Sequence, residues 1–140
     1  MSRLAVSHQE LEQLLSEVAF TRGFGFTLGS IEYGKCVINV PFQPVFERPG
    51  GIVSGQVYMA AADVAMWLAI KTRLGIGDNS VTTELKTIFL RAAQQEDITC
   101  SATVLKLGKQ LIYGTAESRS RAGDLLTHHT ITYARASKPG

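Results

Sequence analysis

The chain has 140 residues, of which 45% are hydrophobic and 19% charged, enough apolar material for a packed core rather than disorder. Its formal net charge of +2 is too small to favour nucleic acid as the main partner. No stretch reaches the roughly 20 apolar residues of a membrane span, and the N-terminus lacks the apolar segment of a secretory signal. We therefore expect one domain over residues 1–140, located in the cytoplasm, with no nucleic-acid or membrane partner.

The N-terminal part predicts a helix followed by a hairpin. Within residues 1–22, one helical face carries the apolar side chains Leu11, Leu14, Leu15 and Val18. Ser7 or His8 stands before the predicted first turn. The next segment, FTLGSIEYGKCVINVPFQP, has alternating apolar runs on both sides of Gly34-Lys35, which indicates a hairpin or two extended segments.

A long apolar helix is predicted over residues 54–73. The loop ERPGGIVSGQ precedes it, Ser54 is placed as its N-cap, and GIGDN ends it. In the stretch SGQVYMAAADVAMWLAI the only charged residue is Asp63. An ionised carboxylate inside an apolar helix is costly unless a partner neutralises it or a reaction uses it.

The last part of the chain predicts a sheet. SVTTELKTIFL, DITCSATVLKL, KQLIYGTAESRS and LLTHHTITYA are strand-length runs rich in Val, Ile, Thr and Tyr, joined by short polar segments. They predict an antiparallel four-strand meander over residues 80–135. Since a sheet must cover one face and this helix is apolar nearly all round, we expect an α+β fold, with an antiparallel sheet wrapped around the long central helix.

Two residues of the central helix supply a minimal set of groups for acyl transfer. Asp63 acts as general base or nucleophile, and the N–H of Gly55, unpaired in the first turn, binds a developing oxyanion. Eight residues of helix span about 12 Å, so both groups of one chain cannot flank one carbonyl carbon. Two copies of the helix, antiparallel about a two-fold axis, would bring Asp63 of one chain to Gly55 of the other. We therefore expect a homodimer with sites at the subunit interface. The alternative is a structural Asp63, bonded to the main chain or to a hydroxyl group.

Four segments in this order, SGQVYMAAADVAM, VTTELKTIFLRAA, LKLGKQLIYGTAESRS and HHTITYA, resemble the PaaI-type hotdog-fold acyl-CoA thioesterases. The resemblance covers nearly the whole chain. It implies a hotdog fold, dimers that often pair into tetramers, an acyl-CoA thioester as substrate, and neither a metal nor a cofactor.

The resemblance also implies roles for individual residues. Asp63 matches the catalytic acid, Gly55 the oxyanion glycine, and Thr82 a hydroxyl residue that positions water or the carboxylate. Ser54 stands where the family has His, and Gln56 replaces a second Gly. We expect Ser54 and Gln56 to contact substrate.

Three cations complete the expected substrate contacts. Arg48 occupies the place of a family Asn or Gln that holds the thioester or water. Arg91 and Lys109 fall in the region that faces the nucleotide end of CoA in the family, where cations suit the phosphates.

Two other functions stay open at this point. A hotdog enoyl-CoA hydratase or dehydratase needs a His working with the acid, and Ser54 removes the obvious one. A non-catalytic acyl-CoA binding module would keep the fold alone. His128 and His129 alternate faces on a strand, so at most one points inward. Cys36 and Cys100 lack metal spacing and are interpreted as small buried side chains in a reducing compartment.

Overall fold

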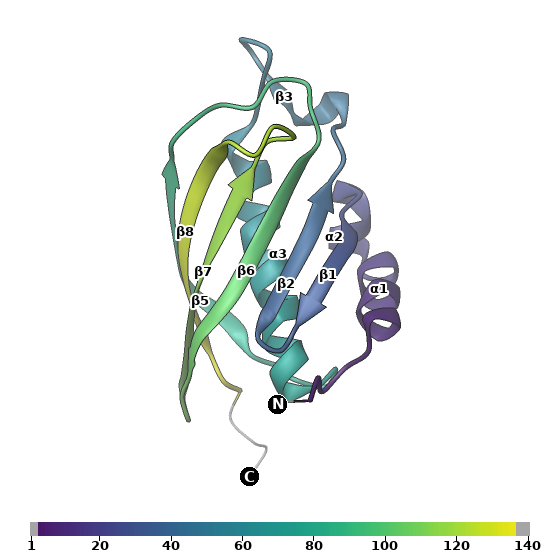
Figure 1. The fold of residues 1–140 in the computed structure, drawn as a ribbon, viewed down its shortest axis with the longest axis vertical. Helices are drawn as coiled ribbons and strands as arrows, with labels where there is room; N and C mark the ends of the chain where they lie inside the picture. Colours follow the sequence, from purple (N-terminus) through teal and green to yellow (C-terminus); the bar gives the residue numbers. More distant parts are fainter. Residues whose placement is uncertain (1–2, 137–140) are drawn as a thin grey trace.

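A six-stranded antiparallel sheet curves around one long helix in the computed structural model, which describes residues 3–136 (Figure 1). The helices are α1 (His8–Glu17), α2 (Ala19–Phe24), the 3-10 helix η1 (Pro44–Phe46) and the long α3 (Gly55–Leu74). The large sheet contains β1 (Thr27–Glu32), β2 (Lys35–Val40), β5 (Val81–Phe89), β6 (Ile98–Leu107), β7 (Leu111–Arg119) and β8 (Leu125–Ala134). A small hairpin pairs β3 (Glu47–Arg48) with β4 (Ile52–Val53). The predicted α+β fold, an antiparallel sheet around a central helix, is confirmed.

The central helix α3 begins directly after Ser54 and ends at Leu74, one residue beyond the predicted span. Ser54 is the N-cap residue, as predicted, with an extended backbone, although its side chain accepts no hydrogen bond from the first turn. The helix packs tightly on the concave face of the sheet. Where it passes β7, Gly114 leaves room for Met66, because a Cβ there would clash with the methionine side chain.

The strand order differs from the predicted four-strand meander. The order is β1-β2-β6-β7-β8-β5, so β6, β7 and β8 form a meander while β5 pairs with β8 at the edge. Two features explain the difference. The segment 90–97 is too long for a tight hairpin, and its chain crosses the end of the sheet (Figure 1). In addition, β5 alternates little and leaves most of its residues exposed, which suits an edge strand rather than a central one.

The N-terminal helix predicted within residues 1–22 is two helices. Ser7 caps α1 in a capping box with Glu10, and α1 ends at Glu17 because Val18 has an extended backbone. The same Val18 is the N-cap residue of α2. Residues 1–2 and 137–140 of the expected domain lie outside the described residues.

One edge of the large sheet is covered by a helix, whereas the other edge and the neighbouring face of α3 are open. At one sheet edge α1 packs against β1, and His8 Nε2 donates to the Gly29 oxygen at 2.7 Å. At the other edge, β5 exposes Val81, Ile88 and Phe89 and pairs with no further strand among the described residues. Beside it, α3 presents a stripe of exposed or half-buried residues at helical spacing, namely Gln56, Met59, Ala60, Asp63 and Trp67.

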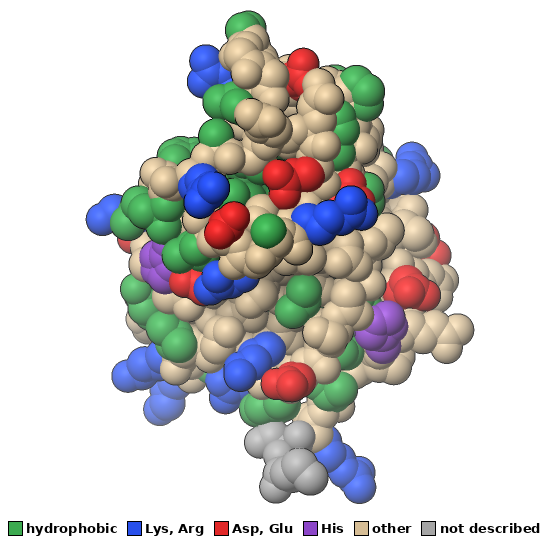
Figure 2. Space-filling view, turned by 45° about the horizontal axis from the view of Figure 1, so that its top comes forward, with side chains coloured by type: hydrophobic (Ala, Val, Ile, Leu, Met, Phe, Trp, Pro, Cys, Tyr) green, Lys and Arg blue, Asp and Glu red, His purple; other side chains and the backbone are tan. Residues whose placement is uncertain are grey.

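The charged surface is mixed rather than of one sign. On the face drawn in Figure 2, Lys and Arg side chains alternate with Asp and Glu side chains. Among residues 3–136, no helix is long and apolar enough to span a membrane.

Candidate functional site

Two hydroxyl groups hold Asp63 at the open side of α3. Thr82 Oγ1 and the Tyr133 hydroxyl each donate to Oδ1 of Asp63 at 2.7 Å. The Tyr133 hydroxyl also lies 3.0 Å from the main-chain oxygen of Asp63. Oδ2 accepts no hydrogen bond from residues 3–136. One carboxylate oxygen is therefore fixed by the protein, and the other keeps its acceptor sites unpaired among the described residues.

The two hydroxyls reach Asp63 because they belong to one cross-strand pair. Thr82 on β5 is the register partner of Tyr133 on β8. Burial, together with the charge of Asp63, raises the pKa of Tyr133 far above its usual range, so its hydroxyl stays a protonated donor. The predicted proximity of Thr82 and Asp63 is present, whereas the contact from Tyr133 was not predicted.

A mostly apolar hollow of about 300 Å³ opens beside Asp63. Its lining comes from the N-terminal segment (Val18, Phe20, Thr21), from α3 (Asp63, Val64, Trp67) and from residues leading into and along the sheet (Ser80, Val81, Thr82, Tyr133). Because a cavity of about 150 Å³ holds one benzene molecule, the hollow has room for a ring or a short alkyl chain. The carboxylate therefore stands next to space for an apolar group.

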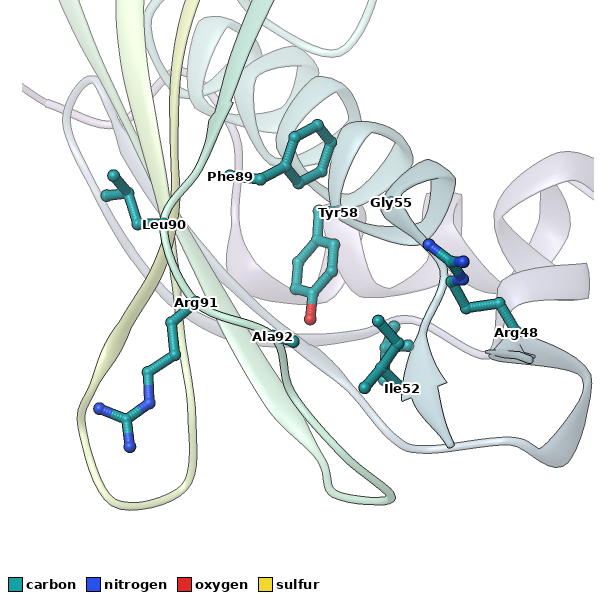
Figure 3. A pocket seen from close by; sticks show the side chains of 9 residues that line it. Arg48, Ile52, Gly55, Tyr58, Phe89, Leu90, Arg91 and Ala92 are labelled. Carbon is teal, nitrogen blue, oxygen red and sulfur yellow. The ribbon is translucent and has the colours of Figure 1, made fainter. Parts of the chain in front are cut away.

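A second hollow, of about 400 Å³, contains Gly55 at the start of α3 (Figure 3). As predicted, no acceptor among the described residues takes the Gly55 N–H. The Phe89 ring covers this position, because a Cβ at residue 55 would lie 3.1 Å from its Cε1 and Cζ atoms. The buried Tyr58 ring lies 6.2 Å from the Phe89 ring, and its hydroxyl accepts the Ala93 N–H at 3.1 Å. Glycine at position 55 thus keeps the first turn of α3 clear of Phe89.

Arg48 and Arg91 both line this second hollow but differ in direction. Figure 3 shows the Arg48 guanidinium turned toward the first turn of α3, whereas the Arg91 side chain extends away from Tyr58 and Phe89. Arg91 lies 3.9 Å from Asp124 in an exposed ion pair, which contributes little to stability. Arg48 is therefore the cation near Gly55, and Arg91 stands at the rim.

Ser54 and Gln56 line a third hollow, separate from the one that contains Gly55. Phe20 and Phe24 of α2 lie on its other side. Phe20 also borders the Asp63 hollow, so the two hollows are neighbours along the open stripe of α3.

Lys109 lies at the opposite end of the sheet from Arg91. It belongs to the turn before Leu111, which pairs with Ala134, and Ala134 also pairs with Val81 at the start of β5. Arg91 instead follows the end of β5. Within one chain the two cations do not form one rim.

Gly55 and Asp63 lie in different hollows, and β5 connects them. The strand begins beside Asp63, which Thr82 contacts, and ends beside Gly55, which Phe89 covers. The open sheet edge therefore runs the full distance between the two groups.

The histidines of β8 take no part in these hollows. His129 is fully buried, with its ring nitrogens 2.9 Å from the Thr87 hydroxyl and 2.7 Å from the Thr127 hydroxyl. Burial, and secondarily the neighbouring His128, lowers the pKa of His129 to about 4. His128 instead lies 3.1 Å from Glu117. Among the described residues, no three His, Cys, Asp or Glu side chains gather as a metal site would need.

Sequence reasoning missed most aromatic residues of the hollows, and Tyr58, Phe89 and Tyr133 are the ones nearest Gly55 and Asp63. Tyr58 lies one turn after Gly55 and Phe89 ends a strand, positions that packing alone also explains. For Tyr133 a signal existed, since a hydroxyl at an inward position of the last strand needs a buried acceptor. The one acidic residue of the apolar helix, Asp63, was the obvious candidate for that acceptor.

Comparison with known proteins identifies the class. In solved structures the same fold occurs in the PaaI protein of Escherichia coli, with a TM-score of 0.83, 18% identity, and coverage of 92% of this chain and 92% of that one. A conserved protein of Pseudomonas aeruginosa is 26% identical with a TM-score of 0.83, covering 89% of this chain and 98% of that one. The fold is a hotdog fold, as predicted.

The family follows from sequence. The thioesterase superfamily profile matches residues 50–127, more than half of the chain. A Saccharolobus solfataricus protein named "Putative esterase" is 31% identical over 96 residues, covering 69% of this chain and 68% of that protein. The chain belongs to the thioesterase superfamily, which confirms the resemblance at the level of superfamily and fold.

Proposed function

We propose that the protein is an acyl-CoA thioesterase that works as a homodimer, hydrolysing the thioester to a free acid and CoA. The observation that carries the proposal is Asp63, a half-buried carboxylate with one oxygen fixed by two hydroxyls and the other free beside an apolar hollow. A fixed carboxylate next to space for an acyl group suits a general base or nucleophile.

The proposed reaction uses groups of two chains. Oδ2 of Asp63 takes a proton from water as the water oxygen attacks the thioester carbonyl carbon, and the oxyanion accepts the partner's Gly55 N–H. The intermediate then collapses with cleavage of the C–S bond. The proton on Asp63 passes to the departing CoA sulfur, which restores the carboxylate. Direct attack by the carboxylate, through an anhydride that water then hydrolyses, uses the same groups.

The open edge supports the homodimer. An uncovered edge strand offers main-chain groups for pairing with another strand, and β5 adds exposed apolar side chains to them. Because β5 runs from Asp63 to Gly55, antiparallel pairing of two β5 strands about a two-fold axis sets each Asp63 opposite the Gly55 of the other chain. The stripe on α3 would pack against its own copy in the same dimer. A pair of such dimers would form the tetramer that the resemblance implies.

The cations complete the proposed substrate contacts. Arg48, beside the first turn of α3, suits an anionic or carbonyl part of the substrate, and Arg91 at the rim suits the CoA phosphates. We assign Ser54 and Gln56 to the neighbouring wall. We assign Lys109 to the turn beside the start of β5, which antiparallel pairing of the two β5 strands would bring toward the partner's Arg91. The two buried free thiols, Cys36 and Cys100, support a reducing compartment such as the cytoplasm.

Hydrolysis is tested directly with a panel of acyl-CoA thioesters and detection of the released thiol. We expect turnover by the wild-type protein with at least one apolar acyl group. Binding of acyl-CoA without any thiol release across the panel would instead identify a binding module. A hydratase would add water to enoyl-CoA, but no histidine among the described residues lines the Asp63 hollow, which disfavours that chemistry.

A further inference from the structure

Tyr133 differs from the other residues around Asp63 because it is almost fully buried. Its exposed fraction is 3%, whereas Thr82 is exposed on the edge strand. The buried hydroxyl lies 2.7 Å from Oδ1 and 3.0 Å from the main-chain oxygen of the same residue. One side chain of β8 therefore contacts both the carboxylate and the backbone of α3 at position 63.

The contact geometry separates the two carboxylate oxygens. Oδ1 receives two hydroxyl donors, so its lone pairs are largely used. Rotation of the carboxylate would break both hydrogen bonds, and hydrogen bonds to a charged group are about twice as strong as neutral ones. Loss of the Thr82 contact alone would leave the Tyr133 contact in place.

We propose that Tyr133 is a positioning residue that fixes Asp63 through Oδ1 and so assigns the reaction with substrate to Oδ2. The inference rests on the proposed function for its catalytic consequence, but the positioning itself is a property of the folded chain. Burial, together with the charge of Asp63, raises the pKa of Tyr133, which keeps its hydroxyl a protonated donor.

The test compares the wild type with Tyr133→Phe, which removes only the hydroxyl, and with Tyr113→Phe as the matched control. Tyr113 lies on β7, is 41% exposed, and its hydroxyl makes no hydrogen bond to a described residue. The first readout is the NMR signal of the Asp63 carboxyl carbon at one fixed pH, assigned by its loss in Asp63→Asn. The second readout is kcat and KM on a hydrolysed thioester.

In Tyr133→Phe we expect the Asp63 carboxyl-carbon signal to shift, because the carboxylate loses a hydrogen-bond donor. We expect kcat to fall about 10- to 100-fold with little change in KM, from the usual strength of a hydrogen bond to a charged group. Tyr113→Phe should change neither. An Asp63 carboxyl-carbon signal identical in the wild type and Tyr133→Phe overturns the proposal. A shifted signal without any hydrolysis by the wild type would instead contradict only the proposed function.

A second variant covers the case in which Tyr133→Phe does not fold. Site-specific 3-fluorotyrosine at position 133 keeps the ring and the hydroxyl but makes the hydroxyl a stronger donor. The Asp63 carboxyl-carbon signal should then shift in the direction opposite to its shift in the phenylalanine variant. An unchanged signal in the fluorotyrosine protein likewise overturns the proposal.

Discussion

Asp63 is the side chain on which the catalytic and structural interpretations differ. Asp63→Asn keeps its shape but removes the base, so we expect turnover to fall by about 10²- to 10⁴-fold while the protein stays folded. A purely structural Asp63 would give the opposite result, with a lower melting temperature and unchanged activity per folded molecule. Thiol release and thermal unfolding, measured on one preparation, distinguish the two, and near-wild-type turnover in folded Asp63→Asn would contradict the mechanism.

Gly55 allows the main-chain amide to be tested with a matched pair of variants. Gly55→Ala adds a Cβ that presses on the exposed Phe89 ring but keeps the N–H. Gly55→Pro adds similar bulk and removes the N–H, and proline is tolerated in a first helical turn. We expect Gly55→Ala to retain most activity and Gly55→Pro to lose about 10²- to 10³-fold in kcat. Equal losses in both variants would show that crowding of Phe89, rather than the amide, matters.

His129 predicts how stability depends on pH. Its pKa is lowered from 6.5 to about 4 in the folded chain, chiefly by burial. Between these values the unfolded chain binds more protons, so the free energy of unfolding falls as pH decreases, by up to about 1.4 kcal/mol per pH unit. Urea unfolding across this range measures the slope, and His129→Gln should flatten it. An equally steep slope in folded His129→Gln would exclude His129 as its origin.

At single positions, the sequence predicted Asp63 and Gly55 because each breaks a pattern. Asp63 is the lone acidic residue of an apolar helix, and Gly55 has an unpaired amide at the start of that helix. The same logic failed for Tyr133 and Phe89, since aromatic residues on strands are usually explained by packing. Their roles depend on distances between β5, β8 and α3, which spacing along the chain does not give.

Among the elements, β5 shows most clearly where pattern and topology separate. Its strand character was predictable from Thr82 to Phe89, but its place in the sheet was not, because pairing depends on the long segment 90–97. For helix α3, by contrast, the position in the chain could be predicted from local signals. Its ends were predictable to within a residue because apolar composition, Ser54 and the glycine loop all act locally.

The exposed edge of β5 predicts a variant that weakens the proposed dimer. Ile88→Asp places a charge on a 45% exposed apolar residue of this strand, while Leu105→Asp does the same on β6 at a 57% exposed residue away from the edge. Because a symmetric dimer carries each change twice, we expect the dimer dissociation constant to rise about tenfold in Ile88→Asp. Mass measured against concentration should stay unchanged in Leu105→Asp. Equal masses for all three proteins would place the dimer contact elsewhere.

For the whole molecule, the proposed sharing of each site between two chains can be tested by mixing inactive subunits. Asp63→Asn and Gly55→Pro should each be inactive alone. In a mixed dimer, two-fold symmetry puts both changes in one site and leaves the other site intact. Random re-pairing of equal amounts makes about half of the dimers mixed, so activity should recover to about a quarter of the wild-type value.

The helix length makes this outcome specific. Residues 55 and 63 are about 12 Å apart along α3 and line separate hollows of the single chain. If both groups nevertheless served one site from one chain, every site in a mixed dimer would keep a change, and mixing would restore nothing. Subunit exchange is verified with tagged chains, and both variants are shown to be folded before mixing. Exchange without recovery would therefore exclude a site built from two subunits, while recovery near a quarter fixes Asp63 and Gly55 on opposite sides of one carbonyl.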